Sequence, residues 1–256
     1  FPYTTLFRSV ISMVFDHLLQ FFSFLGVPSW FGWIGRIAAP IFLFESSEGF
    51  IHTSNRRKYM FRLLLGFWIM GILNGILNAY FSTGGLIINN IFGTLFLGTV
   101  YMQSMDYFKQ KQIGKGLLWF IVPLLISALP LVVFSSPDIL SNPAILIGFQ
   151  IFNLIVPSLM MTEGGFLFVL LAVAFYLFHG KKWLQISAIG VVALISAASY
   201  NFQELFGVNH QWMMILAAIP IVLYNGEKGR GMRNFFYIFY PAHIAIFAII
   251  SFFMQR

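Results

Sequence analysis

The stretch Val10-Ile-Ser-Met-Val-Phe-Asp-His-Leu-Leu-Gln-Phe-Phe-Ser-Phe-Leu25 places two ionisable residues, Asp16 and His17, in the middle of an apolar run. A charged side chain at the centre of a membrane helix costs roughly 2.5–3.5 kcal/mol even on the mildest scale. Such residues face a bundle interior or a wet cavity, where that cost is reduced. The pair therefore marks a candidate functional site in a helix that crosses a membrane.

The composition of the whole chain predicts the same class of protein. Charged residues make up 9% of the 256 residues and apolar residues 59%, whereas a soluble domain carries about 25% charge. The apolar runs are continuous rather than alternating, which excludes a β-barrel. We therefore expect an all-α, polytopic helical membrane bundle of about nine to ten transmembrane helices.

The net charge and the lack of cysteine exclude several other classes of protein. A formal charge of +7 in a membrane protein reports loop orientation, and the sequence has no soluble basic domain that could bind nucleic acid. Without cysteine there is no disulfide, thiol nucleophile or thiolate metal ligand. The five histidines are scattered, with no His-x-x-x-His pair, so no metal site is expected.

The positions of basic residues predict how the chain crosses the membrane. They cluster at Arg56–Arg62, Lys109–Lys115, Lys181–Lys182 and Lys228–Arg233. All four clusters fall on one face if Ala144–Leu159 does not cross, so we expect nine crossings and a cytoplasmic amino terminus. Ala144–Leu159 is then an interfacial or re-entrant helix on the outer side. The expected crossings are Val10–Leu25, Trp30–Phe50, Leu63–Phe81, Ile91–Phe108, Gly116–Phe134, Gly165–Phe178, Leu184–Tyr200, Trp212–Tyr224 and Phe235–Met254.

The sequence predicts one domain. The segment Phe1–Ser9 resembles a translated sequencing adaptor, so we expect it to lie outside the native protein. Residues 10–256 contain no visible repeat, appended soluble domain or long linker. We therefore expect a single membrane-embedded domain over residues 10–256.

The second apolar segment carries charged residues of its own, among them Arg36 and Glu48. They lie about 18 Å apart along a helix, so they cannot form one salt bridge. Pro40 between them should kink the helix. Asp16 and His17 point about 100° apart, so one can face Arg36 while the other faces a ligand. Glu48 is a candidate helix-end or loop partner near the inner interface.

Several polar residues have a structural interpretation beside a functional one. His17 is either a chemical group or an interhelical hydrogen-bonding residue, and Arg36 either locks Asp16 or binds a ligand. Glu45 and Asp106 are expected to be structural. Three histidines are expected in solvated loops, namely His52, His179 and His210. Four asparagines are expected to join helices by hydrogen bonds, without a catalytic role: Asn74, Asn78, Asn89 and Asn90.

Four groups of motifs together resemble one known family. They are Met13-Val-Phe-Asp-His17; Gly35-Arg-Ile-Ala-Ala-Pro-Ile-Phe42 running on to Glu48-Gly-Phe50; Leu223-Tyr-Asn-Gly-Glu-Lys-Gly229; and Phe236-Tyr-Ile-Phe-Tyr-Pro-Ala-His243. With them, nearly the whole chain after Ser9 resembles the TraX family, and Glu163-Gly-Gly165 fits the same pattern. The family is named for a protein that acetylates the amino terminus of a conjugative pilin. It is similar to a wider group of membrane acyltransferases, including the sugar O-acyltransferases and heparan-α-glucosaminide N-acetyltransferase.

The resemblance implies roles for individual residues. His17 matches the catalytic first-helix histidine of the sugar O-acyltransferases and would act as general base or transient acyl carrier. Arg36 matches a second-helix arginine and, with Asp16, completes the expected catalytic set. The expected substrate-binding residues are Glu48, Tyr240 and His243.

The resemblance also implies acetyl-coenzyme A, or a similar acyl thioester made in the cytoplasm, as the donor substrate. Basic side chains suit its phosphates, although orientation in the membrane and contact with anionic lipid would explain the same residues. The expected donor-binding residues are Arg56, Arg57, Lys58, Arg62, Lys228 and Arg230.

The sequence therefore predicts an acyltransferase of the bacterial inner membrane. Its expected partners are acyl-coenzyme A, the lipid bilayer and an acceptor that is a peptide, glycan or lipid; a homo-oligomer is compatible with the sequence. The alternative is a proton-coupled transporter of small solutes or lipids, because buried Asp, His and Arg also form proton relays and substrate clamps. The family resemblance and the lack of a visible inverted repeat favour the enzyme.

Overall fold

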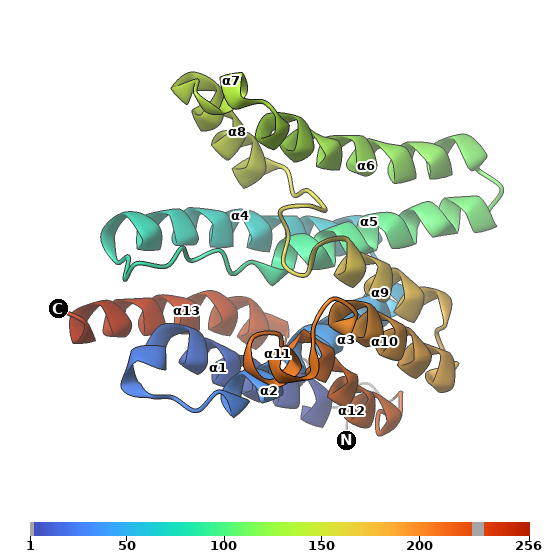
Figure 1. The fold of residues 1–256 in the computed structure, drawn as a ribbon. Helices are drawn as coiled ribbons and strands as arrows, with labels where there is room; N and C mark the ends of the chain where they lie inside the picture. The colour runs from blue at the N-terminus through green and yellow to red at the C-terminus, as the bar shows by residue number, and fades with distance from the viewer. Residues whose placement is uncertain (1–2, 227–232) are drawn as a thin grey trace.

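The computed structural model describes residues 3–226 and 233–256, and every regular element within them is helical (Figure 1). Within the described residues, three helices are long and apolar enough to cross a membrane: α4 (Arg56–Tyr80), α6 (Ile113–Ser135) and α13 (Arg233–Met254). The all-α prediction is confirmed, and the apolar helices fit a membrane protein. The other elements are α1 (Tyr3–Phe22), η1 (Ser23–Leu25), α2 (Trp30–Gly35), α3 (Ala38–His52), α5 (Ile91–Lys109), α7 (Pro137–Leu140), α8 (Pro143–Ile155), α9 (Gly165–Leu177), α10 (Lys182–Ala197), α11 (Phe202–Gly207), η2 (Gln211–Ala217) and α12 (Ala218–Val222).

The first helix begins before the apolar run that predicted it. α1 begins at Tyr3, within the segment Phe1–Ser9, and Ser9 is buried. The origin of that segment outside the native protein stays a prediction.

Apolar side chains cover much of the outside of the bundle. On α4 the exposed residues Phe61, Leu65, Ile69, Ile72 and Ile76 recur every three or four positions, so they form one stripe along the helix. α6 lies at the edge of the bundle (Figure 1), and only 11% of its most apolar window is buried. Exposing such apolar surface to water is unfavourable, whereas lipid tails are themselves apolar, so the surface fits a membrane protein.

The core of the bundle surrounds α3. This helix packs against α1, α5 and α9, and α13 packs against α1 and α4. Phe50, Phe92, Phe175 and Tyr240 are among the largest fully buried side chains. Aromatic residues thus fill the space between helices, and the first and last helices lie side by side.

The second apolar segment is divided into α2 and α3 rather than kinked. The break falls at Arg36 and Ile37, and Pro40 lies in the first turn of α3. A proline is tolerated there because the first N–H groups of a helix have no intrahelical partner. The predicted interruption is present, but it precedes Pro40, and the Arg36 and Ile37 amides still donate to the carbonyls of Gly32 and Ile34.

An extended segment returns along α4 before α5 begins. Asn78 exchanges two hydrogen bonds with the backbone of Ile87, at 2.9 and 2.8 Å, and Asn74 Nδ2 donates to the Asn89 carbonyl at 2.9 Å. Asn90 Nδ2 donates to the carbonyl of Phe67 at 3.0 Å. α5 therefore starts level with the middle of α4. The asparagines expected to join helices instead support a non-helical backbone, which lipid could not hydrate.

α8 and α9 are two short helices joined by the non-helical segment 156–164, of which residues 157–159 are buried. The carbonyl of Ile155, at the end of α8, accepts a hydrogen bond of 2.7 Å from Trp68 Nε1 in the middle of α4. Each helix has 13 residues, about 20 Å. The helix expected over Ala144–Leu159 ends earlier, at Ile155, and the chain continues into α9; its position relative to a membrane stays a prediction.

The described basic clusters gather at one end of the bundle, here called the basic end. Arg56 forms an ion pair with Asp106, and Tyr176 donates to the same carboxylate. Lys109 lies 4.5 Å from the Tyr176 ring centroid. Lys182 Nζ donates to the carbonyls of residues 222 and 224, at 2.8 and 2.6 Å. Asp106 has the structural partners expected for it.

Positive-inside orientation predicts that the basic end faces the cytoplasm. Since the chain has no cysteine, Lys182→Cys in intact bacteria should resist an impermeant maleimide and react only after permeabilisation. Ser141→Cys, exposed between α7 and α8 at the opposite end (Figure 1), is the control and should react in intact cells. Labelling of Lys182→Cys from outside would contradict the nine-span arrangement.

Candidate functional site

All three predicted catalytic residues line one pocket, formed where several helices begin or break. Its walls come from α1, the α2–α3 break, the segment 156–164, the start of η2 and α13. The pocket holds about 560 Å³ of empty space, part of it open to solvent. Its polar lining residues are Asp16, His17, Arg36, Glu163, Gln211 and Tyr240.

Asp16 and Arg36 face each other across this pocket as an ion pair. Gly35 packs so closely against Asp16 that a Cβ atom at this position would overlap the carboxylate. A second guanidinium nitrogen, Nη1, donates to Gln211 Oε1 at 3.4 Å. These contacts link the broken second segment to α1 and to η2, and both alternatives for Arg36, a structural lock on Asp16 and a ligand-binding group, stay open.

His17 and His243 form a hydrogen-bonded pair whose tautomers follow from their partners. His243 Nδ1 lies 2.8 Å from the Phe239 carbonyl, which can only accept, so this nitrogen carries a proton. His243 Nε2 is then an acceptor, and His17 Nδ1, 2.6 Å away, donates to it. His17 Nε2 is left with a lone pair, which accepts from Asn89 Nδ2 at 3.1 Å. Two neutral imidazoles thus leave one basic nitrogen at the pocket.

Asn89 is a site residue that the sequence did not indicate. Its amide also exchanges hydrogen bonds of 2.8 and 2.9 Å with the Gln20 amide. Asn89 and Gln20 line a second pocket that shares Asp16, Arg36 and Glu163 with the first. The polar space therefore continues past His17 toward the end of the bundle opposite the basic end.

Tyr240 joins α13 to the starts of α5 and α9. Its hydroxyl accepts from the Ile91 amide at 3.2 Å and donates to Glu163 Oε2 at 3.4 Å. Thr94 Oγ1 donates to the Glu163 carbonyl at 2.6 Å. Glu163 is thus a pocket carboxylate with no assigned role at the sequence level, where only the Glu163-Gly-Gly165 motif pointed to it.

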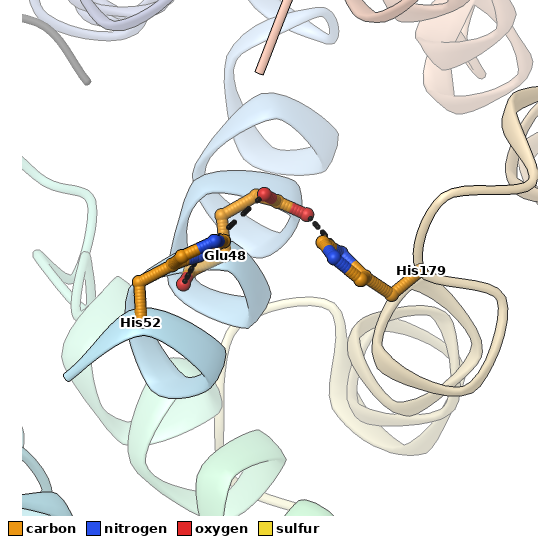
Figure 2. Close-up of side chains that lie close together, drawn as sticks. All are labelled: Glu48, His52 and His179. Atoms are coloured by element: carbon orange, nitrogen blue, oxygen red, sulfur yellow. Dashed lines mark hydrogen bonds and ion pairs between the residues drawn. The ribbon is translucent and has the colours of Figure 1, made fainter. Parts of the chain in front are cut away.

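Glu48 lies away from this pocket, at the basic end. Its Oε1 accepts a hydrogen bond of 2.8 Å from His179 Nδ1, and His52 lies beside it one helical turn later (Figure 2). His52 and His179 were expected to be solvated. Both remain partly exposed but contact the Glu48 carboxylate, because the turn after α9 packs against the end of α3.

His210 differs from the solvated residue that the sequence predicted. Its ring packs against Trp33, with ring centroids 6.3 Å apart. Burial lowers the pKa of His210, and the positive charge of Arg36 lowers it further. The loop before η2 is therefore part of the pocket surroundings rather than a free surface loop.

The predicted donor-binding residues separate into different environments. Arg56 pairs with Asp106 and lies 4.6 Å from the Phe50 ring centroid, whereas Arg57 and Lys58 are exposed. Arg62 borders an apolar groove on the outside of the bundle, lined by α4 and α13. Lys228 and Arg230 lie outside the described residues.

The matches between this chain and known proteins include the whole pocket. The family model described as TraX protein matches residues 8–251, which include every residue of the pocket. A relative named probable fimbrial assembly protein FimC, serogroup H1, from Dichelobacter nodosus is 26% identical over 261 residues, 96% of this chain and 94% of the relative. No solved structure matches the chain.

In the turn next to Glu163, adding one methyl group at Gly164 should lower the stability of the fold. Gly164 has φ +71°, and a Cβ there would overlap the Phe168 ring. Gly164→Ala should therefore lower the thermal unfolding midpoint in detergent, since the left-handed backbone alone costs about 1–2 kcal/mol. Gly75→Ala, in α4 and facing open space, is the control and should be neutral or slightly stabilising. Equal midpoints for the two variants would refute the described turn.

Proposed function

This chain belongs to the TraX family, and we propose that it is an integral membrane acyltransferase. It moves an acetyl or similar acyl group from acyl-coenzyme A to an acceptor at the membrane or its outer face. The observation that carries the proposal is the basic Nε2 of His17, oriented by His243 beside the Asp16–Arg36 pair. A base held by a second group, next to a cation, is the arrangement that acyl transfer requires.

In the proposed reaction His17 acts as the base. The acceptor N–H or O–H gives its proton to His17 Nε2 in place of the Asn89 hydrogen bond, and its nitrogen or oxygen attacks the thioester carbonyl. The carbon–sulfur bond breaks, and the imidazolium returns the proton to the departing thiolate. In the two-step form, Nε2 attacks the thioester carbonyl and the carbon–sulfur bond breaks, which releases the thiolate and leaves an acyl-imidazole. The acceptor then attacks the acyl group, the bond to Nε2 breaks, and the acceptor proton goes to the thiolate by way of the freed imidazole.

Arg36 is the proposed stabiliser of negative charge on the carbonyl oxygen. The pocket also contains two carboxylates, Asp16 and Glu163, against this one arginine. The excess of acidic groups suits an acceptor that carries an amine. Because the relative is named a fimbrial assembly protein, an amine of a fimbrial subunit is the first acceptor to test, ahead of glycans and lipids.

The proposed donor route begins at the basic end. Arg62 borders the groove between α4 and α13, and its wall residue Phe92 packs against Tyr240 of the pocket, with ring centroids 5.3 Å apart. The acyl chain can lie in this apolar groove while the phosphates meet Arg57, Lys58 and Arg62. Arg56 is engaged by Asp106, so its role is structural; Lys228 and Arg230 remain proposed phosphate partners.

We further propose that the protein lies in the bacterial inner membrane with its amino terminus in the cytoplasm. Nine crossings, with α8 and α9 together forming one broken crossing, would bring every basic cluster to the cytoplasmic face. This orientation presents the donor groove to the compartment where acyl thioesters are made.

One feature favours a second candidate, a proton-coupled transporter. Segment 81–90 returns along α4 before α5 begins, segment 156–164 separates α8 from α9, and both line polar space, as do the broken helices that hold the substrate in some transporters. Buried Asp16, His17 and Arg36 could then relay protons and clamp a solute.

His17→Ala should abolish transfer from acetyl-coenzyme A to a fimbrial-subunit peptide while leaving expression and thermal unfolding close to wild type. Loss of a general base lowers turnover by about 100- to 10,000-fold. His243→Ala should give a smaller loss, because it removes only the group that orients His17. Full activity of purified His17→Ala, measured as acetylated product by mass spectrometry, would show that the base is wrongly assigned.

Donor binding separates the enzyme from the transporter without any knowledge of the acceptor. Acetyl-coenzyme A at 100 times its dissociation constant should stabilise the purified protein by about 2.7 kcal/mol, seen as a raised unfolding midpoint. Arg62→Ala should reduce that shift at a fixed donor concentration. The matched control is Lys115→Ala, a basic-end residue beside Tyr107 and away from the groove. No shift at saturating donor would favour the transporter.

A further inference from the structure

A second cluster of reactive side chains lies at the basic end, outside the pocket proposed for acyl transfer. Glu48 and His52 come from the last turns of α3, and His179 from the turn after α9, and all three side chains point toward one another (Figure 2). One potential ligand atom from each lies within 4.8 Å of the others. His52 and His179 are far apart in sequence, so no spacing motif predicts this cluster.

The hydrogen bonds around these three residues leave them able to bind one cation together. The Glu48 side chain is only 9% exposed, yet its carboxylate contacts two imidazoles. His52 Nδ1 lies 2.9 Å from the Glu48 carbonyl, to which it donates. Ligand histidines commonly use one ring N–H on a backbone carbonyl, which leaves the other nitrogen free to bind metal.

The donor set matches a particular class of metal. Two imidazoles and a carboxylate, with water at the fourth position, are a usual set for Zn²⁺. Ligands at about 2.0–2.2 Å from zinc lie roughly 3.4 Å apart in a tetrahedral site. His52 and His179 have side chains 64% and 43% exposed, so small rotations of these rings can close the remaining distance.

The surroundings leave room for a fourth ligand. The three residues line a pocket of about 700 Å³ of empty space that also contains Gln185 and Tyr224. Lys182, the nearby lysine of that pocket, is held by two carbonyl groups at the end of α12. Its charge is thus directed toward those carbonyls rather than toward Glu48.

We propose that Glu48, His52 and His179 bind one divalent transition-metal ion of the zinc class. The ion would join the end of α3 to the α9–α10 turn and neutralise the buried carboxylate. Neither the site nor its test involves acyl transfer, so it stands or falls separately from the proposed function.

The test uses the full chain purified in detergent, with any histidine tag removed and bound metal stripped by a chelator. Titration with Zn²⁺ in a calorimeter should give one ion per chain and a higher unfolding midpoint. Co²⁺ should give the intense visible bands of tetrahedral coordination, without interference from thiols because the chain has no cysteine. A wild-type chain that binds no stoichiometric ion would overturn the proposal.

Substitutions then assign the ligands. Glu48→Gln keeps the shape of the side chain but removes its charge, and it should weaken Zn²⁺ binding at least tenfold, as should His179→Ala. If either variant fails to fold, His52→Ala decides, since its exposed side chain can be removed without opening the core. His210→Ala is the matched histidine control and should bind as wild type does. Wild-type affinity in His52→Ala, or an equal loss in His210→Ala, would contradict the assignment.

Discussion

The rest of the structure depends on how its backbone hydrogen bonds are satisfied where helices stop. Inside a bilayer no water replaces a missing intrahelical bond, so each interruption needs a partner from the protein. Asn78 supplies both an acceptor and a donor to Ile87, Thr94 binds the Glu163 carbonyl, and the Tyr240 hydroxyl takes the first amide of α5. These bonds hold non-helical chain in the middle of an otherwise helical bundle.

The pocket is a consequence of these interruptions. The α2–α3 break, the start of α5, the segment before α9 and the start of η2 all meet around Asp16 and Arg36. A helix end brings unpaired backbone groups and polar supporting side chains with it. Polar groups therefore collect here: the two imidazoles are buried in protein, and the Asp16–Arg36 pair lies in the partly open pocket.

Much of this fold could be predicted from the chain alone, because long apolar runs and basic clusters carry the information. Most helix positions and the separation of Arg36 from Glu48 follow from helical rise and periodicity, which also point Asp16 and His17 in different directions without deciding which of them faces Arg36. The contacts of Glu48 with His179 and of His17 with Asn89 do not, since they join residues 131 and 72 positions apart. Asn89 was expected only to join helices by hydrogen bonds, because it falls between two predicted crossings, and the extended segment that carries it has no apolar period that would indicate its position.

The pairing of the first helix with the last has a consequence for biosynthesis. His17 and His243 are 226 residues apart, and Ser251 Oγ donates to the Phe21 carbonyl at 2.7 Å. At 5–20 residues per second, a ribosome needs about 10–45 s to synthesise the second histidine after the first. During that interval His17 has no His243 to bond with, so the paired imidazoles of the proposed site form only after the last helix has been made.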